Sequence, residues 1–292
     1  MFALLRSKPA KAVLLAGAGL MVFSTLVAQA AGVSSRSRTL DGPAGRLFVD
    51  DGGPRVDQGQ LPVLFVHSFA GNTSHWQPAL QHLRLTRRAV AMDFRGHGRS
   101  TTPRSNSAYA TTDLAADIAA VADGLALRRF VLVGHSMGGS AAVAYASAHP
   151  ERVAALVLVA TPGKAPQEMS SKVMDSLRAD YDKTMAGYWD SLLKGARPPV
   201  RRGREAEQHR IGREASMAMI ESTFAYDPLP ALAAYAGPEL IIDTEHAAGA
   251  AALHSQAPQI ERRVVSGTSH WPQLDDPPAF ARLLDEFLSR VQ

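Results

Sequence analysis

The feature that most constrains this sequence is one serine, Ser136, with a glycine two positions away on either side. An apolar run typical of a buried strand, Phe130 to Val133, leads into it, and an Ala-rich stretch with helical spacing, Met137 to His149, follows at once. This order predicts a sharp strand-to-helix turn. The turn would hold the serine hydroxyl above a sheet, because a Cβ at either glycine would collide with the neighbouring chain. Ser136 is therefore a candidate nucleophile.

Strand-like and helical patterns alternate on both sides of this turn and predict βαβ crossovers on a parallel sheet. The alternation stops between residues 163 and 236, where only helical patterns occur, which predicts an inserted helical cap. We expect an α/β fold with a mostly parallel, doubly wound sheet, whose core comprises residues 31–162 and 237–292. Strands are expected at 61–66, 89–92, 130–133, 153–159, 239–243 and 262–265, with a strand or hairpin at 46–50, and helices at 76–85, 113–125, 137–149, 170–193, 205–224 and 278–291.

Residues 1–30 form a segment of a different kind. Three basic residues come first, an apolar run extends from Ala12 to Val27, and small residues occupy positions 28 and 30. This is the pattern of an export signal, with cleavage before Ala31 and a mature chain in the periplasm or outside the cell. The alternative is an uncleaved membrane anchor, although the apolar run is shorter than the ~20 residues that a spanning helix needs.

The amino-acid composition excludes several classes of partner and cofactor. The chain has no cysteine, which excludes disulfides, a thiol nucleophile and a thiolate-held metal. Its formal charge is +4, but three of the positive residues lie in the N-terminal segment, so the rest of the chain carries no strong basic field for nucleic acid or a membrane surface. There is no His-Glu-x-x-His motif and no nucleotide-binding glycine fingerprint. We expect a small-molecule substrate, no metal and no cofactor.

Three further segments accompany the serine turn. Residues 67–71 read His-Ser-Phe-Ala-Gly, residues 93–100 read Asp-Phe-Arg-Gly-His-Gly-Arg-Ser, and residues 267–272 read Gly-Thr-Ser-His-Trp-Pro. Together they resemble the α/β-hydrolase fold family, specifically its members with a helical cap. The first segment resembles that family's His-Gly-x-x-Gly oxyanion loop, with serine at the second position. The resemblance covers about residues 40–162 and 237–290, and it implies a serine hydrolase.

A serine nucleophile needs a base, and His270 is the best candidate among ten histidines. It follows a predicted strand on the far half of the sheet, so it should reach the same carboxyl edge as Ser136. The main-chain N–H groups of Phe69 and Met137 are the expected oxyanion hole. His67, in the same loop as Phe69, is a candidate substrate contact, although its neighbours are also typical of a histidine that braces a loop.

The acid of the expected triad is where the sequence departs from the family pattern. The family usually places an Asp a few residues beyond the strand predicted at 239–243, and here an alanine occupies that position. Glu245 and Asp243 are the nearest acids. We expect Glu245 to orient His270, because a loop residue can turn toward the base, whereas the direction of a strand residue is fixed by the sheet. Asp243 is the alternative.

The cap should cover Ser136 and supply apolar walls to the pocket. The candidates are its aromatic and Met side chains, with Trp189 as the expected substrate contact and Met185, Tyr188, Met217 and Phe224 as further walls. Cleavage of a carboxylic ester is the leading hypothesis. Cleavage of an amide, lactone or carbon–carbon bond is an alternative, because fold and triad do not fix the substrate. A binding protein that kept the fold without the acid is another. The sequence does not indicate an oligomeric state.

Overall fold

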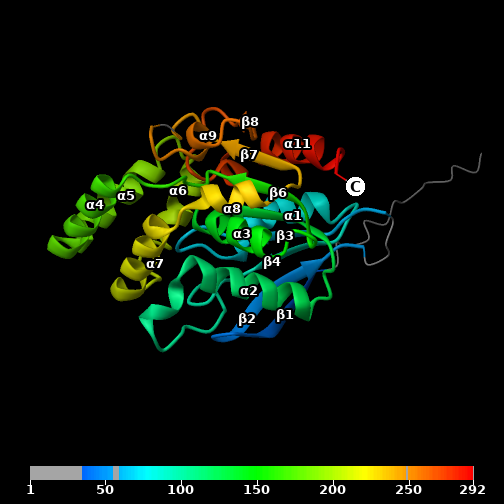
Figure 1. The fold of residues 1–292 in the computed structure, drawn as a ribbon, viewed down its shortest axis with the longest axis horizontal. Helices are drawn as coiled ribbons and strands as arrows, with labels where there is room; N and C mark the ends of the chain where they lie inside the picture. The colour runs from blue at the N-terminus through cyan, green and yellow to red at the C-terminus, as the bar shows by residue number, and fades with distance from the viewer. Residues whose placement is uncertain (1–34, 55–58, 248, 292) are drawn as a thin grey trace, which may run out of the picture. The chain divides into compact units, whose positions relative to one another are not determined.

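The computed structural model describes residues 35–54, 59–247 and 249–291, and the predicted export signal, residues 1–30, lies outside them. The strands that it describes are β1 (Ser35–Gly42), β2 (Gly45–Gly52), β3 (Val63–Val66), β4 (Ala89–Met92), β5 (Phe130–His135), β6 (Val153–Val159), β7 (Glu239–Asp243) and β8 (Glu261–Val264). They form one sheet in the order β1-β2-β4-β3-β5-β6-β7-β8 (Figure 1). β2 pairs antiparallel with β1 and β4, and all the other neighbours are parallel. The predicted mostly parallel sheet is confirmed.

Helices cover both faces of the sheet, as predicted for a doubly wound fold. Because side chains alternate along a strand, Phe65 on β3 belongs to the apolar core of one face, and Leu64 belongs to the core of the other. All four residues of β3 and of β4 are buried, as expected for strands that are covered on both sides. The first face packs on α1 (Gln77–Leu83) and α11 (Pro277–Leu288), and the second on α2 (Thr111–Gly124) and α3 (Met137–Ala148).

The register of the strands brings their carboxyl ends together. Val66 on β3 pairs with Gly134 on β5, which pairs with Leu158 on β6. Val159 then pairs with Ile242 on β7. These four strands therefore end at one edge of the sheet, and the loops that follow them meet there. In open α/β sheets this edge is where ligands bind.

Five helices separate β6 from β7, in the region predicted as a cap, and α4, α5 and α7 gather at the left of Figure 1. The predicted helix at 170–193 is in fact two helices, because Asp180 is extended and its carboxylate accepts the N–H of Lys183 at 3.1 Å to cap the second. The predicted helix at 205–224 begins only at Arg213, after an extended Gly212. The five helices are α4 (Gln167–Ala179), α5 (Tyr181–Leu192), α6 (Pro198–Glu205), α7 (Arg213–Ala225) and α8 (Pro228–Ala234).

The β1–β2 hairpin is longer than the sequence indicated. Its register extends from the pair Ser35–Gly52 to the pair Gly42–Gly45 at the turn. Most side chains of β1 are exposed, so this strand lacks the apolar pattern by which the others were predicted. Among the described helices, none has both the length and the apolar character that crossing a membrane requires.

Candidate active site

The strained turn predicted at Ser136 is present between β5 and α3. Ser136 has φ 54° and ψ −120°, a conformation that non-glycine residues rarely adopt. A Cβ on Gly134 would lie 2.6 Å from the carbonyl oxygen of Gly138, and a Cβ on Gly138 would collide with the carbonyl oxygen of His67. Glycine is therefore required at both positions for β3, β5 and α3 to approach each other as closely as they do.

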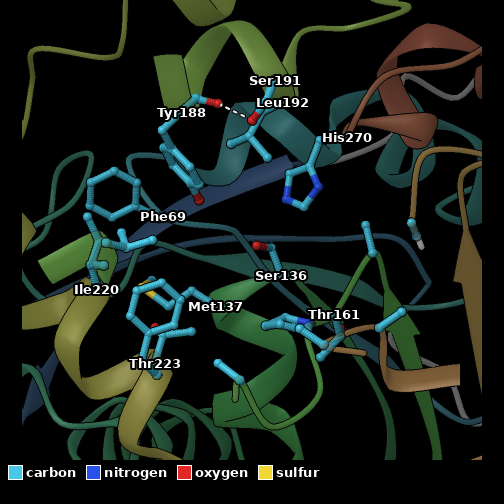
Figure 2. Close-up of a pocket in the computed structure, with 18 of the residues that line it drawn as sticks. Phe69, Ser136, Met137, Thr161, Tyr188, Ser191, Leu192, Ile220, Thr223 and His270 are labelled. Atoms are coloured by element: carbon cyan, nitrogen blue, oxygen red, sulfur yellow. Dashed lines mark hydrogen bonds between the residues drawn. The ribbon is translucent and has the colours of Figure 1, made fainter. Parts of the chain in front are cut away.

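Ser136 opens into a cavity of about 410 Å³, which we call the chamber. Helices α4, α5 and α7 line it on the cap side, and the loops after β3, β5, β6 and β7 line it on the core side. Figure 2 shows Tyr188 and His270 on one side of Ser136, and Met137 and Thr223 on another. Of the five cap residues predicted as walls, Met185, Tyr188 and Phe224 line the chamber.

Trp189 and Met217, the other two predicted cap walls, do not line the chamber. The prediction that Trp189 contacts substrate is wrong, because its side chain is only 3% exposed and is part of the apolar core. Its indole is parallel to that of Trp271, with ring centroids 5.8 Å apart. Trp189 thus joins α5 to the residue that follows His270.

His270 lines the same chamber as Ser136, and Figure 2 shows its imidazole turned toward the serine hydroxyl. Its Nε2 is buried and has no hydrogen-bond partner among the described residues. Burial lowers the pKa of His270 to about 4, so the ring is neutral at pH 7 and able to accept a proton. The expected pair of nucleophile and base is thus brought together, while its catalytic role stays a prediction.

The main chain of His270 is held from both sides. Its N–H donates to the carbonyl of Leu192 at the end of α5, at 3.0 Å. Its carbonyl accepts a hydrogen bond from Nε2 of His135, at 2.8 Å, and the amide of Gln273 lies 3.2 Å from Nδ1 of the same ring. His135, which precedes the nucleophile in the sequence, is therefore a positioning residue that sequence reasoning missed.

Neither predicted acid contacts His270. Glu245 is exposed and lies 3.8 Å from the Nε2 of His246, outside the chamber lining. Asp243 does line the chamber, but it is buried, and it bonds to Nδ1 of His254 at 2.9 Å and to Nε of Arg262 at 3.2 Å. In the part of the chain that the structure describes, no carboxylate is hydrogen-bonded to the base. The assignment of Glu245, or of Asp243, as the orienting acid therefore has no contact to support it.

The expected oxyanion hole lies beside the serine. Phe69 and Met137 both line the chamber, and their N–H groups have no hydrogen-bond partner among the residues described. Met137 is the first residue of α3, where an N–H has no helical partner and the helix dipole favours negative charge. Ala70, next to Phe69, has φ 53°, so the backbone of this loop is strained as well.

His67 braces the loop and does not reach the chamber, so the prediction that it contacts substrate is wrong. It is fully buried, and both of its ring nitrogens are engaged. Nδ1 donates to the carbonyl of Ser68 at 2.8 Å, and Nε2 accepts the N–H of Phe94 at 3.0 Å. The side chain thus joins the loop after β3 to the loop after β4, which is the bracing role that its neighbours also indicated.

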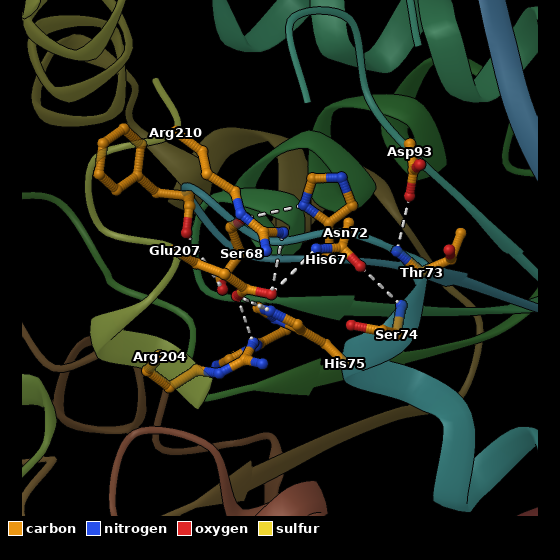
Figure 3. Close-up of polar contacts among 12 residues, drawn as sticks. His67, Ser68, Asn72, Thr73, Ser74, His75, Asp93, Arg204, Glu207 and Arg210 are labelled. Atoms are coloured by element: carbon orange, nitrogen blue, oxygen red, sulfur yellow. Dashed lines mark hydrogen bonds and ion pairs between the residues drawn. The ribbon is translucent and has the colours of Figure 1, made fainter. Parts of the chain in front are cut away.

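A buried polar cluster, centred on Glu207, joins the cap to the segment that follows Phe69 (Figure 3). Glu207 is 5% exposed, and it accepts hydrogen bonds from Asn72 at 3.2 Å and from Nε2 of His75 at 2.9 Å. Arg204 and Arg210 lie 2.8 and 3.4 Å from its carboxylate. Burial lowers the pKa of His75 well below its usual range, so this imidazole donates to Glu207 in its neutral form. The residues of this cluster lie far apart in the sequence, and the sequence analysis did not identify it.

No group of three or more His, Cys, Asp or Glu side chains in the described ranges is arranged to hold a metal ion.

The sequence and the fold are similar to those of known proteins. A model of the family described as alpha/beta hydrolase fold matches residues 62–202. A protein of Bacillus subtilis (strain 168), provisionally named 2-succinyl-6-hydroxy-2,4-cyclohexadiene-1-carboxylate synthase, is 27% identical over 267 residues, which are 84% of this chain and 96% of that protein. The non-heme chloroperoxidase of Streptomyces lividans is 35% identical over 158 residues, which are 51% of this chain and 55% of the relative. The crystal structure of an enol-lactonase from Burkholderia xenovorans LB400 matches with a TM-score of 0.73 at 23% identity, covering 87% of this chain and 100% of the other.

Proposed function

Because this chain belongs to the α/β-hydrolase fold family, we propose that it is a serine hydrolase that cleaves a carboxylic ester through an acyl-enzyme on Ser136. One observation carries the proposal: the strained Ser136 and the unpartnered imidazole of His270 open into one chamber. A serine beside a neutral imidazole is the arrangement that nucleophilic acyl transfer uses.

The chemistry follows from the positions of these groups. The Oγ of Ser136 attacks the ester carbonyl, while a ring nitrogen of His270 takes the hydroxyl proton and returns it to the leaving alcohol. The oxyanion accepts hydrogen bonds from the N–H groups of Phe69 and Met137, which are fixed before the reaction begins. Water, activated by the same imidazole, then hydrolyses the acyl-enzyme and restores the serine.

Replacement of the nucleophile tests the proposal. We expect Ser136→Ala to abolish hydrolysis of short p-nitrophenyl esters and labelling by a fluorophosphonate, with an unchanged thermal midpoint. His270→Ala should slow labelling of Ser136 almost as severely, because the serine then lacks its proton acceptor. Full esterase activity in Ser136→Ala would refute the proposal.

A ligand-binding protein is the second candidate, and the absence of a carboxylate contact at His270 among the described residues favours it. Loss of the orienting acid can cost ~10⁴ in turnover, although an oxyanion hole alone still leaves ~10³ to 10⁴ over water. The labelling rate separates the two functions. A hydrolase is labelled at Ser136 much faster than a free serine, whereas a binding protein binds small molecules without such labelling.

The names of the relatives suggest other chemistries for the same site. The name of the Bacillus subtilis relative specifies a compound with a carboxylate, and such groups are commonly bound by Arg or Lys. Neither occurs among the described residues that line this chamber. The enol-lactonase favours lactone cleavage as the variant to test beside esters, since a lactone is a cyclic ester and needs no further residue.

We also propose that the protein is exported and loses residues 1–30. The proposal rests on the basic start, the apolar run and the small residues at 28 and 30. The intact mass of the chain recovered from the periplasm or medium tests it: a chain that starts at Ala31 supports export with cleavage, and a full-length chain in the membrane fraction contradicts cleavage.

A further inference from the structure

The positions of His270 and the oxyanion hole determine where each part of an ester lies. This step rests on the proposed function. The leaving alcohol must face His270, which returns its proton, and the carbonyl oxygen must face the N–H groups of Phe69 and Met137. The acyl chain is then directed away from His270. Figure 2 shows Ile220 and Thr223 of α7 on the side of Ser136 away from His270.

The α7 side of the chamber is apolar. Met219, Ile220 and Phe224 line it together with Met137. Thr223 also lines it, but its hydroxyl donates to the carbonyl of Met219 on its own helix, at 2.8 Å, and so is not needed by a ligand. Met side chains are flexible and adapt to the shape of an apolar chain.

The charged groups of the chamber lie elsewhere. Among the described residues that line it there is no Lys or Arg, and the one carboxylate, that of Asp243, lies at the end of β7 on the core side. A carboxylate at the end of an acyl chain would therefore be buried against Met219 and Phe224 without a partner, which costs several kcal/mol in a protein interior. The volume of about 410 Å³ falls within the ~300–1,000 Å³ range of small-molecule pockets and exceeds what an acetyl group fills.

We propose that the α7 side of the chamber is an acyl subsite for an uncharged aliphatic chain longer than acetyl. The residues that form it are Met137, Met219, Ile220, Thr223 and Phe224. The enzyme would thus select esters of medium-chain fatty acids over acetyl esters and over esters of dicarboxylic acids.

A series of p-nitrophenyl esters, from acetyl to dodecanoyl, tests the subsite in the unmodified protein. We expect kcat/KM to rise by up to roughly fourfold for each added methylene until the chamber is full, because each buried methylene is stabilised by ~0.8 kcal/mol. A half-ester of adipic acid, with a free terminal carboxylate, should react on the order of 100-fold more slowly than the hexanoyl ester. Equal rates along the series, or a preference for the adipate, would overturn the proposal.

A matched pair of variants on α7 locates the subsite. Ile220 lines the chamber and Met217, three residues earlier, does not. Ile220→Phe should lower the ratio of octanoyl to acetyl hydrolysis by roughly tenfold, because the larger ring occupies the acyl path. Met217→Phe should leave that ratio unchanged. If both variants change the ratio equally, the acyl chain does not lie along α7.

Labelling by a fluorophosphonate keeps this test separate from that of the proposed function. A protein that is labelled at Ser136 and hydrolyses acetyl esters, but shows no dependence on chain length, is a serine hydrolase without this subsite. A protein that is not labelled lacks the proposed function itself. The chain-length series on the unmodified protein remains decisive even if Ile220→Phe fails to fold.

Discussion

His270 is anchored through its main chain, yet its ring has no carboxylate contact among the described residues. Leu192 and His135 hold the peptide groups on either side of its Cα. In a complete triad, a carboxylate fixes the tautomer of the imidazole and stabilises its charged form. Here, burial acts on the ring without that compensation, and it lowers the pKa of His270 to about 4. If His270 is the base of the proposed reaction, it is a weak one.

This low pKa predicts an unusual pH profile. A general base must be neutral, so activity should be full well above pH 4 and should be lost as the pH falls through about 4. The measurement is kcat/KM for a neutral ester between pH 3.5 and 8, at temperatures where the fold is stable. An acidic limb near pH 6.5 or above would show that a carboxylate reaches the ring in solution.

The two predicted acids can be compared directly. We expect Glu245→Gln to leave both turnover and the acidic limb unchanged, because this side chain is exposed and its partner among the described residues is His246. Asp243→Asn should lower the thermal midpoint, because buried contacts to His254 and Arg262 lose their charge. A fall of ~10² or more in kcat for Glu245→Gln, without loss of stability, would instead restore this residue to the triad.

At the scale of elements, the cap is joined to the core loops around Ser136 at two places. The end of α5 is bonded to His270, and the turn after α6 is bonded through Glu207 to Asn72 and His75. The segment that contains Asn72 directly follows the loop of Phe69. One side of the cap therefore holds the main chain of His270, and another holds the segment that follows Phe69.

The second connection predicts the effect of Glu207→Gln. Removing this charge leaves Arg204 buried without its partner, which typically costs ~3–5 kcal/mol of unfolding free energy. The looser loop should also lower kcat more than it raises KM, since the oxyanion forms only in the reaction. The matched control is Glu205→Gln, whose exposed pair with Arg201 should contribute under ~1 kcal/mol. Similar losses in both variants would mean that the cluster has no special role.

The sequence predicted those features whose constraints are local. The turn at Ser136 needs glycine within two residues on either side, and a buried strand needs only a run of Val and Leu, so both could be read from short segments. The contacts that hold the site together are not local. His75 and Glu207 are 132 positions apart, and His135 bonds to the carbonyl of a residue 135 positions away. No periodicity encodes such pairs.

The cap helices were predicted with wrong bounds for a different reason. A continuous amphipathic pattern covers Asp180, and only the capping hydrogen bond of that residue shows where one helix ends and another begins. Trp189 was misassigned because an aromatic residue at helical spacing does not reveal whether it faces a ligand or another ring. Its partner, Trp271, is far away in the sequence: Trp189 precedes β7, and Trp271 follows β8.

At the scale of the whole molecule, five of the described histidines lie in the interior as neutral imidazoles. Burial lowers the pKa of each of them, to about 4 for His97 and His270. Unfolded histidines have a pKa near ~6.5. Below that pH the unfolded chain therefore binds protons that the folded chain does not, which favours unfolding. The residues concerned are His67, His75, His97, His135 and His270.

We therefore expect the thermal midpoint to be highest above pH 6.5 and to fall as the pH decreases from 6.5 toward 4. Glu239 opposes this trend, because burial raises its pKa to about 7 and its folded form takes up a proton first. Calorimetry across this range measures the slope. His97→Gln should make the slope shallower by the equivalent of one proton, because a buried neutral imidazole is removed. A midpoint that is flat from pH 6.5 to 5 would contradict the prediction.

The parallel indoles of Trp189 and Trp271 bear on how such a protein could be engineered. An inserted cap can be exchanged for the cap of a relative in order to change which substrates the protein accepts. In this chain, residues 163–236 would take with them the carbonyl that holds His270 and the ring that packs on its neighbour. A chimera with a new cap would therefore have a changed pocket and would also lose the contacts that hold His270 in place. Directed evolution of specificity should therefore start from single positions on α7. Helix α5 should be kept unchanged together with the core.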